Sequence, residues 1–364
     1  MISVLTTSVA VLATTAWVMT VFNALTMRVV RRSDAELVEP SVSILIPMRN
    51  EESNVDEVIP TVLNQQLLKQ SEVLVLDDHS TDGTFEKLSQ YPEESVRVIR
   101  SGELLPGWLG KPNACHQLAQ VASGKFLVFV DADVILDQQA IAAAISNMER
   151  WDWDFISPYP HELVGSLAER LIQPLLQWSW MASVPLRLAE KIFSRSMTIA
   201  NGQFFVVKRS AYISIGGHTS IKNKVLDDLE LARALKSAGF TGGVAEGSQV
   251  AHCRMYSSAR ELNSGYTKSL WTAFGGGPGT FLAIALLLWT GFFPILLAIS
   301  GSPWGWSAFL AIWSSRLIAA VRTRSSAFTA VLHPLSTIYL IFLIGLSWRL
   351  KSQGKLQWRD RLIS

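Results

Sequence analysis

The sequence contains very little cysteine and almost no net charge. Cys115 and Cys253 are its only cysteines in 364 residues, and they lie far apart without a metal-ligand spacing. This argues against a disulfide framework and against a zinc site, and both thiols are expected to be reduced and to face the cytosol. The 32 Lys and Arg residues nearly balance 30 Asp and Glu residues, for a net charge of +2. Nucleic-acid binders usually carry a strong basic field, so no nucleic acid is expected as a partner.

Charged residues are scarce, at 17% against 49% hydrophobic residues, and the mean hydropathy is +0.26. A chain this apolar is expected to have a membrane part. Residues 2–27 carry no charged side chain and, at about 1.5 Å per helical residue, can cross a hydrocarbon layer. A signal peptide is the alternative, but Arg28, Arg31 and Arg32 follow the apolar run instead of preceding it. An anchor helix is therefore predicted, with the next segment in the cytoplasm.

From Pro40 to about Gly275 the sequence resembles a soluble α/β domain. Short apolar runs typical of strands alternate with segments of helical length, such as 52–69 and 112–122. The runs are 41–47, 71–78, 96–100 and 125–133. This order predicts a mainly parallel sheet, in which ligands bind at the carboxyl ends of the strands.

Three more apolar stretches follow, at roughly 280–300, 304–321 and 328–348, and Arg316 interrupts the second. If all three span the membrane, the basic tail lies outside, against the positive-inside rule. Either one stretch is re-entrant or interfacial, or the tail is an exception. The predicted domains are an anchor over 1–27, a soluble domain over 28–278, C-terminal membrane helices over 279–348 and a basic tail over 349–364.

Residues 163–193 combine apolar side chains at helical spacing with Trp and Arg. This pattern is typical of a helix in a membrane interface, where a lipid acceptor would be met. A helix packed on the sheet is the alternative. Pro174 and Pro185 are expected to break the helix in either case.

Acidic residues follow two of the predicted strands. FVDAD places Asp131 and Asp133 after one strand, and their hard oxygen ligands suit Mg²⁺ or Mn²⁺ that also binds phosphates. LDDHSTDGT places Asp77 and Asp78 after another, where a carboxylate can accept from ribose hydroxyls or a base N–H. Taken singly, each pair also fits an ordinary turn or helix cap.

Other charged residues extend this pattern. PMRNEE places Arg49 and Glu51 just past a strand, and GWLGKPNA places Lys111 before a helix starting near Pro112. A cation there can face a phosphate, although a solvated lysine is equally consistent. Asp227 and Asp228 open a helix that Gly239 would end. Acids in a first turn usually interact only with the helix dipole, but a catalytic base must also lie at such an edge.

Together these motifs resemble the family 2 glycosyltransferases with the GT-A fold. In chain order they are PMRNEE, LDDHSTDGT, GWLGKPNACHQLA, FVDADV, NGQFFVVKRSAYISIGGH, the Asp227–Asp228 pair and CRMYSSARELNSGYTK. The resemblance runs from about residue 41 to 275 and on into the apolar tail. GWLGK, RMY, GYTK, LHPL and GKLQW are similar to the carotenoid (diaponeurosporenoate) glycosyltransferase subgroup.

The resemblance implies an α/β, Rossmann-like nucleotide-sugar-binding domain with transmembrane helices at both ends, and it implies roles for individual residues. Asp131 and Asp133 would hold a divalent ion, Mg²⁺ or Mn²⁺, on the diphosphate, and Asp228 would deprotonate the acceptor, with Asp227 as the alternative. The implied nucleotide-sugar contacts are Pro47, Arg49, Glu51, Asp77, Asp78, Lys111 and Asp131. The implied residues on the acceptor or diphosphate side are Gly202, Gln203, Arg254 and Tyr256.

The sequence also departs from the family pattern. The QxxRW motif of chain-forming members is missing, and Arg254, Met255 and Tyr256 take its place, which argues against a processive polysaccharide synthase. The carotenoid subgroup often has Glu where this chain has Asp227, which leaves the choice of base open. The residues after Trp358 also differ from that subgroup, which leaves the acceptor open.

The leading hypothesis is a membrane-bound inverting enzyme that moves one hexose, glucose from UDP-glucose, to a lipid-soluble acceptor such as a carotenoid. A hopanoid or a ceramide-type sphingolipid is the alternative acceptor, and a non-catalytic nucleotide-binding membrane protein is the alternative class. The expected location is the plasma membrane, with several spans and a cytoplasmic catalytic domain.

Overall fold

The computed structural model describes residues 2–358 and 361–362, and it divides into two compact units. The first, here called the α/β unit, comprises residues 28–163 and 188–255. The second, here called the helical unit, comprises the described residues of 1–27, 164–187 and 256–364. This division differs from the expected linear order, because residues 164–187 and 256–278 group with the N-terminal helix.

A seven-stranded sheet forms the centre of the α/β unit, in the order β3-β2-β1-β4-β8-β6-β9. The strands are β1 (Val42–Met48), β2 (Ser71–Asp77), β3 (Arg97–Arg100), β4 (Phe126–Val130), β6 (Phe155–Tyr159), β8 (Phe204–Lys208) and β9 (Gly242–Glu246). All neighbours run parallel except β8, which is antiparallel to β4 and β6. The predicted mainly parallel sheet is confirmed, and the four predicted strands correspond to β1 to β4.

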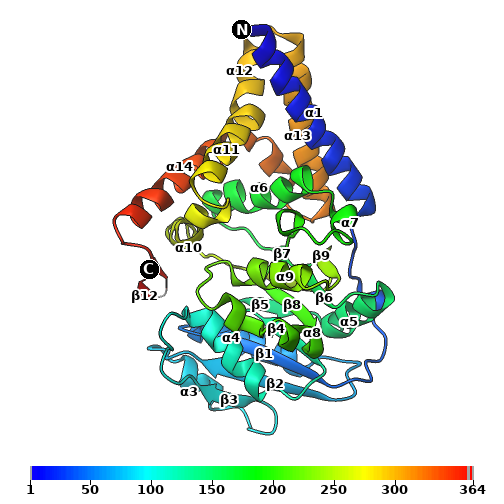
Figure 1. The fold of residues 1–364 in the computed structure, drawn as a ribbon, viewed down its shortest axis with the longest axis vertical. Helices are drawn as coiled ribbons and strands as arrows, with labels where there is room; N and C mark the ends of the chain where they lie inside the picture. Colours follow the sequence, from blue (N-terminus) through cyan, green and yellow to red (C-terminus); the bar gives the residue numbers. More distant parts are fainter. Residues whose placement is uncertain (1, 359–360, 363–364) are drawn as a thin grey trace. The chain divides into compact units, whose positions relative to one another are not determined.

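Helices cover both faces of this sheet (Figure 1). One face packs against α2 (Glu52–Leu63), α3 (Thr84–Leu88) and α5 (Ala140–Arg150), and the other against α4 (Gly110–Val121), α8 (Arg209–Ser214) and α9 (Asp227–Ser237). The pleat of β1 shows why both faces are apolar. Ile44 and Ile46 point into the first layer and Leu45 into the second, and all three are fully buried. Each such side chain stabilises the fold by about 1.5–3 kcal/mol.

Shorter elements complete the α/β unit. A three-stranded sheet has the order β5-β10-β7, and the short helices lie in loops. These elements are β5 (Val134–Leu136), β7 (His161–Glu162), β10 (Ala251–Cys253), η1 (Arg32–Asp34), η2 (Arg195–Met197) and η3 (Gly217–Ile221).

The predicted helices agree with the structure to within a turn or two. The predicted helix over 52–69 is shorter, since α2 ends at Leu63. Pro112 lies in the first turn of α4, where its missing N–H is not needed. The predicted stop of α9 at Gly239 is confirmed, because this residue has a φ of 89°, which favours glycine.

The helical unit contains the N-terminal helix and most of the C-terminal third of the chain. Its elements are α1 (Ile2–Thr26), α6 (Leu167–Ser183), α7 (Leu186–Ala189, whose last two residues fall in the other unit), α10 (Ala259–Ala273), α11 (Gly277–Leu287), the π-helix η4 (Leu288–Phe292), α12 (Phe293–Ile299), α13 (Pro303–Arg322), η5 (Ala327–Ala330), α14 (His333–Ser352), β11 (Gln357–Trp358) and β12 (Arg361–Leu362). Of the predicted basic tail, residues 359–360 and 363–364 lie outside the described residues.

Helix α6 corresponds to the amphipathic segment predicted over 163–193. It packs against α1, α13 and α14 of the helical unit. The Asn23 amide of α1 donates to the carbonyls of Met181 and Val184, both at 2.7 Å. The prediction of a break at Pro174 was wrong, because the helix continues through this residue to Ser183. A guanidinium nitrogen of Arg316 in α13 donates to the Pro174 carbonyl at 2.6 Å, which ties α6 to α13 at this point. The break at Pro185 is confirmed.

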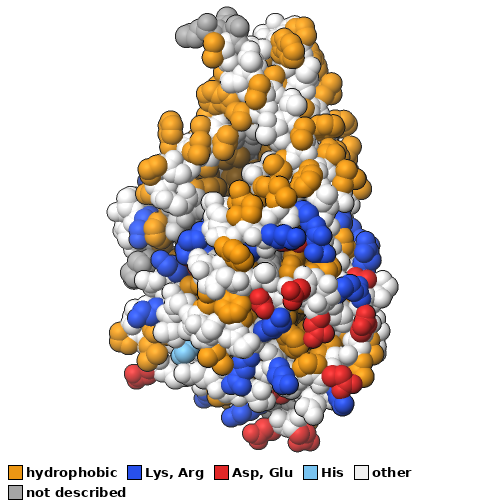
Figure 2. Space-filling view, turned by 45° about the vertical axis from the view of Figure 1, so that its right-hand side comes forward, with side chains coloured by type: hydrophobic (Ala, Val, Ile, Leu, Met, Phe, Trp, Pro, Cys, Tyr) orange, Lys and Arg blue, Asp and Glu red, His pale blue; other side chains and the backbone are white. Residues whose placement is uncertain are grey.

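Two helical segments are long and apolar enough to cross a membrane, Val4–Thr26 and Gly277–Ile299. Their mean hydropathies are 1.7 and 2.4, and only 22% and 28% of each is buried. Core helices and signal sequences can pass the same test of length and composition. Large apolar side chains are exposed along them, including Val11, Val18, Phe281 and Leu282, and Figure 2 shows hydrophobic side chains over this part of the molecule.

Candidate active site

The ends of β1 and β2 are held together by hydrogen bonds. The Asp78 backbone nitrogen donates to the Met48 carbonyl at 2.8 Å, and the Arg49 guanidinium donates to the Asp78 carbonyl at 2.6 Å. Asp77 and Asp78 are both buried. The parallel pairing of Met48 with Asp77 explains this proximity, because both chains leave the sheet at the same edge.

The loops after these strands are similarly connected. Asn50 and His79 adopt left-handed conformations, with φ of 53° and 55°. The Asn50 carboxamide oxygen accepts from the Thr81 backbone nitrogen at 2.8 Å, and the Glu51 nitrogen donates to the Thr84 hydroxyl at 2.8 Å. Arg49, Glu51, Asp77 and Asp78, all predicted from sequence, therefore lie at one edge of the sheet.

A small cavity with a volume of about 20 Å³ lies at the same carboxyl edge, next to β1 and β4, and opens to the solvent. It brings together six of the predicted residues with five that were not predicted. The predicted residues are Pro47, Lys111, Asp131, Gly202, Asp227 and Asp228. The others are Cys115, Phe129, Phe205, His218 and Leu231. Three carboxylates and one lysine line this space.

Lys111 and Asp131 form an ion pair at the cavity. Lys111 is in the first turn of α4, Asp131 directly follows β4, and the ammonium nitrogen lies 2.6 Å from a carboxylate oxygen. Desolvation lowers the pKa of Lys111, but Asp131 and Asp227 outweigh it and hold the pKa well above its usual value. The side chain is 39% exposed, so it is accessible to a ligand phosphate.

Asp228 is fixed by two backbone donors. One carboxylate oxygen accepts from the Gly202 nitrogen at 2.6 Å, and the other accepts from the Leu229 nitrogen at 2.7 Å. Burial and the neighbouring charge of Asp227 raise the pKa of Asp228 to about 6. A carboxylate with this pKa is ionised at neutral pH and basic enough to accept a proton from an alcohol during attack.

Asp133 lies in a second acidic group. It interacts electrostatically with Glu162 of β7 and Cys253 of β10, and burial together with this charge raises the pKa of Glu162 to about 7. The Gln203 amide donates to the Cys253 sulfur at 2.9 Å. Asp131 therefore lines the cavity, whereas Asp133 acts on Glu162 and Cys253 outside it, although only Ala132 separates the two aspartates. Glu162 was not predicted, because nothing in its local sequence distinguishes it from an ordinary strand residue.

The sequence interpretation also missed Cys115 and His218 as site residues. Cys115 belongs to the motif GWLGKPNACHQLA, and His218 is the last residue of NGQFFVVKRSAYISIGGH. The two glycines before His218 could have indicated a tight turn that brings this histidine close to another element. Gly216 and Gly217 have φ of 76° and 51°, and a Cβ at Gly217 would lie 2.4 Å from the Tyr212 ring. The tight approach places His218 in the cavity wall. Burial and the charge of Lys111 lower the pKa of His218 to about 3, so its ring is neutral.

The last two residues predicted for the acceptor or diphosphate side, Arg254 and Tyr256, fall in different units. Arg254 follows β10 in the α/β unit, whereas Tyr256 belongs to the helical unit. The Tyr256 ring packs against Tyr266, with centroids 5.6 Å apart, and against the backbone at Gly265, where a Cβ would lie 2.3 Å from the Tyr256 hydroxyl oxygen.

Comparison with known proteins agrees with this geometry. Residues 43–216 match the family model described as glycosyl transferase family 2. A 4,4'-diaponeurosporenoate glycosyltransferase of Staphylococcus aureus strain bovine RF122 / ET3-1 is 28% identical over 257 residues, which cover 68% of this chain and 65% of the relative. The protein of the same description from strain USA300 is 26% identical over 342 residues, which cover 89% of this chain and 88% of the relative. The chain thus spans just under two thirds of the first relative.

A solved structure is similar over nearly the whole chain. The mannosyltransferase from Pyrobaculum calidifontis, in complex with GDP-Man and Mn²⁺, aligns with a TM-score of 0.61 and 17% identity, covering 98% of this chain and all of that one. At this identity the likeness shows the fold alone, which is a GT-A-like α/β fold with a Rossmann-like sheet.

Proposed function

We propose that this glycosyltransferase moves a single hexose from a nucleotide sugar to a lipid-soluble acceptor, with inversion at the sugar carbon. The family 2 match over residues 43–216 and the similarity to the diaponeurosporenoate glycosyltransferases support this proposal. One observation carries the proposal. A half-buried carboxylate with a raised pKa, Asp228, lines the same cavity as the Lys111–Asp131 pair. A protein that only bound a nucleotide would not need a base beside its phosphate site.

The donor is held along the edge of the sheet. Glu51 and Asp78 contact the nucleoside, and Lys111 contacts the diphosphate through a charge-assisted hydrogen bond. In the free protein the Lys111 ammonium nitrogen lies 2.6 Å from an Asp131 carboxylate oxygen. When the donor binds, its diphosphate replaces Asp131 as the partner of Lys111. UDP-glucose is the proposed donor.

A hard divalent ion fits the residues at the cavity. Asp131, Asp227 and Asp228 line it against the single lysine Lys111, so negative charge is in excess and carboxylate oxygens are available. Asp131 would hold Mg²⁺ or Mn²⁺ at the cavity, and Asp133, whose charge acts on Glu162 and Cys253 in the free protein, would turn towards the ion as the second ligand. When bound, the ion neutralises charge that develops on the departing diphosphate.

Transfer is a single in-line displacement. The acceptor oxygen attacks the anomeric carbon as Asp228 takes its proton, and the bond from that carbon to the diphosphate oxygen breaks. The electron pair of that bond leaves with the nucleoside diphosphate. The two backbone donors to Asp228 hold its carboxylate in place for this step. A carboxylic-acid acceptor would be ionised already and would need the base less.

The acceptor is a carotenoid acid or alcohol, with a hopanoid or sphingolipid as the second candidate. The exposed apolar side chains of α1 and of Gly277–Ile299 support an enzyme that works at a membrane, where such acceptors dissolve. Mass analysis of host lipids after deletion of the gene tests this class directly. Loss of a hexosylated pigment supports the carotenoid, and loss of another hexosylated lipid selects the second candidate.

The catalytic part is proposed to face the cytoplasm of a multi-pass plasma-membrane protein, because Arg28, Arg31 and Arg32 follow the first helix. The chain without residues 1–27 should still require detergent, since Gly277–Ile299 remains. A membrane-impermeant thiol reagent applied to intact cells should leave Cys115 and Cys253 unmodified. Both thiols are buried, so the folded protein would protect them on either side of the membrane. The reagent is therefore applied together with a denaturant, and the control is the same treatment of opened cells, in which both thiols should be modified.

A further inference from the structure

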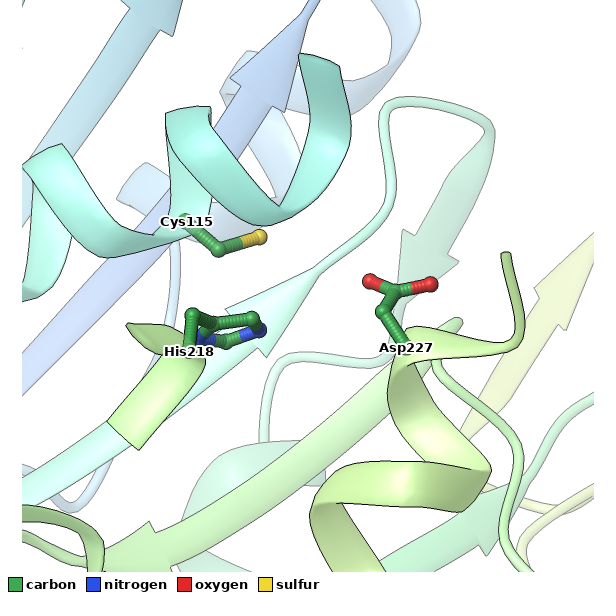
Figure 3. Close-up of side chains that lie close together, drawn as sticks. All are labelled: Cys115, His218 and Asp227. Carbon is green, nitrogen blue, oxygen red and sulfur yellow. The ribbon is translucent and has the colours of Figure 1, made fainter. Parts of the chain in front are cut away.

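Three potential metal ligands meet in the wall of the cavity. Cys115 comes from α4, His218 from η3 and Asp227 from the start of α9. Their sulfur, ring nitrogen and carboxylate oxygen all lie within 4.8 Å of one another, and all three residues are buried. Figure 3 shows the three side chains pointing towards a common space. The spacing of the two cysteines gave no sign of this group, because its members come from distant segments.

The histidine is oriented for ligation. The Tyr212 hydroxyl lies 2.7 Å from Nδ1 of His218 and also accepts from the His218 backbone nitrogen at 3.1 Å. Nδ1 is therefore engaged, and Nε2 is the nitrogen left for the cluster. An outer hydrogen bond of this kind is how proteins orient histidines that bind metals. The ring is also neutral, which is the form that ligates.

The charges of the cavity favour a cation at this point. Lys111 is paired with Asp131, and Asp228 is engaged by two backbone N–H groups. Among the described residues, no Lys, Arg or His side chain forms an ion pair with Asp227, which is 8% exposed. The Lys111 charge reaches Asp227 only at longer range and is shared with Asp131, so three carboxylates face one lysine and the net negative charge favours a bound cation.

We propose that Cys115, His218 and Asp227 bind a thiophilic divalent ion of the zinc class, with a fourth position open to the cavity. One sulfur, one nitrogen and one oxygen ligand form a set that selects zinc over magnesium, which prefers oxygen alone. This site is separate from the proposed Asp131–Asp133 ion, and it does not depend on the proposed transfer activity. Tetrahedral zinc would bring the ligand atoms to about 3.5 Å from one another, a closure of roughly 1 Å.

Binding displaces one proton. The sulfur–metal bond forms as the Cys115 S–H bond breaks, and the proton goes to solvent or buffer. A cysteine thiol has an ordinary pKa of about 8.5, so the free protein retains this proton at neutral pH. The affinity should therefore increase with pH, because metal and proton compete for the same sulfur.

Cobalt is the suitable probe, because a thiolate bound to Co²⁺ gives a charge-transfer absorption that oxygen ligands do not. The full chain in detergent is saturated with Mg²⁺ and then titrated with Co²⁺. We expect one equivalent to produce the band and Zn²⁺ to abolish it by displacement. Cys115→Ser should lack the band. Cys253→Ser is the matched control, since this second buried thiol contacts Gln203, and it should keep the band.

His218→Gln provides the second arm. It should lower the Zn²⁺ affinity by at least about 10-fold, as loss of even an outer partner does in other sites. Absence of the band in the unaltered protein would overturn the proposal whatever the variants do. A band that persists in Cys115→Ser, or that disappears only in Cys253→Ser, would overturn it as well.

Discussion

The Asp228 carboxylate accepts a 2.6 Å hydrogen bond from the Gly202 backbone nitrogen, and residue 202 has no room for a side chain. A Cβ at this position would lie 2.8 Å from the Asp228 Cβ and 3.1 Å from a carboxylate oxygen. The position of the proposed base therefore depends on a glycine that precedes β8, far from it in the sequence.

Gly202→Ala should consequently reduce turnover without removing any catalytic group. A displacement of about 1 Å can lower a rate on the order of 10²-fold. Gly243→Ala is the matched control, since a Cβ at this strand residue meets no atom within 4 Å. Equal turnover in both variants, measured at saturating donor, would show that the Gly202 contact does not position the base.

Asp228→Asn should abolish transfer and leave donor binding within a few-fold, whereas Asp227→Asn should be milder. A general base contributes on the order of 10² to 10⁴ in rate. Turnover and calorimetric donor affinity are measured for both variants. If Asp227→Asn is the inactive one, the base is one residue earlier. If both retain more activity than expected, the acceptor is a carboxylic acid.

Turnover should fall as the pH decreases through about 6, because the pKa of Asp228 is raised to about 6 and its protonated form cannot accept a proton. The Asp227 charge contributes to that rise, so Asp227→Asn should move the acidic limb to lower pH. The rate profile is recorded at saturating donor. A flat profile, or a limb that moves to higher pH in Asp227→Asn, contradicts the assignment.

Lys111→Ala should weaken donor binding by roughly 10- to 100-fold, since a hydrogen bond to a charged group contributes about 1.5–3 kcal/mol. Lys224→Ala is the control, because this exposed lysine lies in the same unit outside the cavity. Isothermal calorimetry with UDP-glucose measures both. Unchanged affinity in Lys111→Ala would remove the residue from the diphosphate site.

Transfer should stop in excess EDTA and return when Mg²⁺ or Mn²⁺ is added, because the leaving diphosphate needs a counter-charge that carboxylates cannot give. In Asp131→Asn, more metal should be needed for half-maximal rate. Full turnover in EDTA would show that Lys111 alone stabilises the leaving group.

Much of the fold and site follows from sequence, for identifiable reasons. The strand that ends at Asp77 and the strand that ends just before Asp131 were predicted, because parallel strands buried on both faces give continuous apolar runs followed by polar residues. The antiparallel direction of β8 was not predicted, because a run such as FFVVK is the same in either direction. His218 was not singled out because its approach to Cys115 depends on tertiary packing at Gly217. Helix α6 continues through Pro174 because its packing outweighs the local preference.

The central claim is that this chain transfers a hexose to a lipid with Asp228 as the base. It is tested by incubating the purified full chain with UDP-glucose, Mg²⁺ and lipid extract in detergent, and by measuring released UDP and hexosylated lipid together. The account predicts equal amounts of the two products, no lipid product without the extract, and neither product above background with Asp228→Asn. Binding of UDP-glucose without either product would contradict it, and so would equal products from Asp228→Asn when the lipid product is linked through an alcohol oxygen.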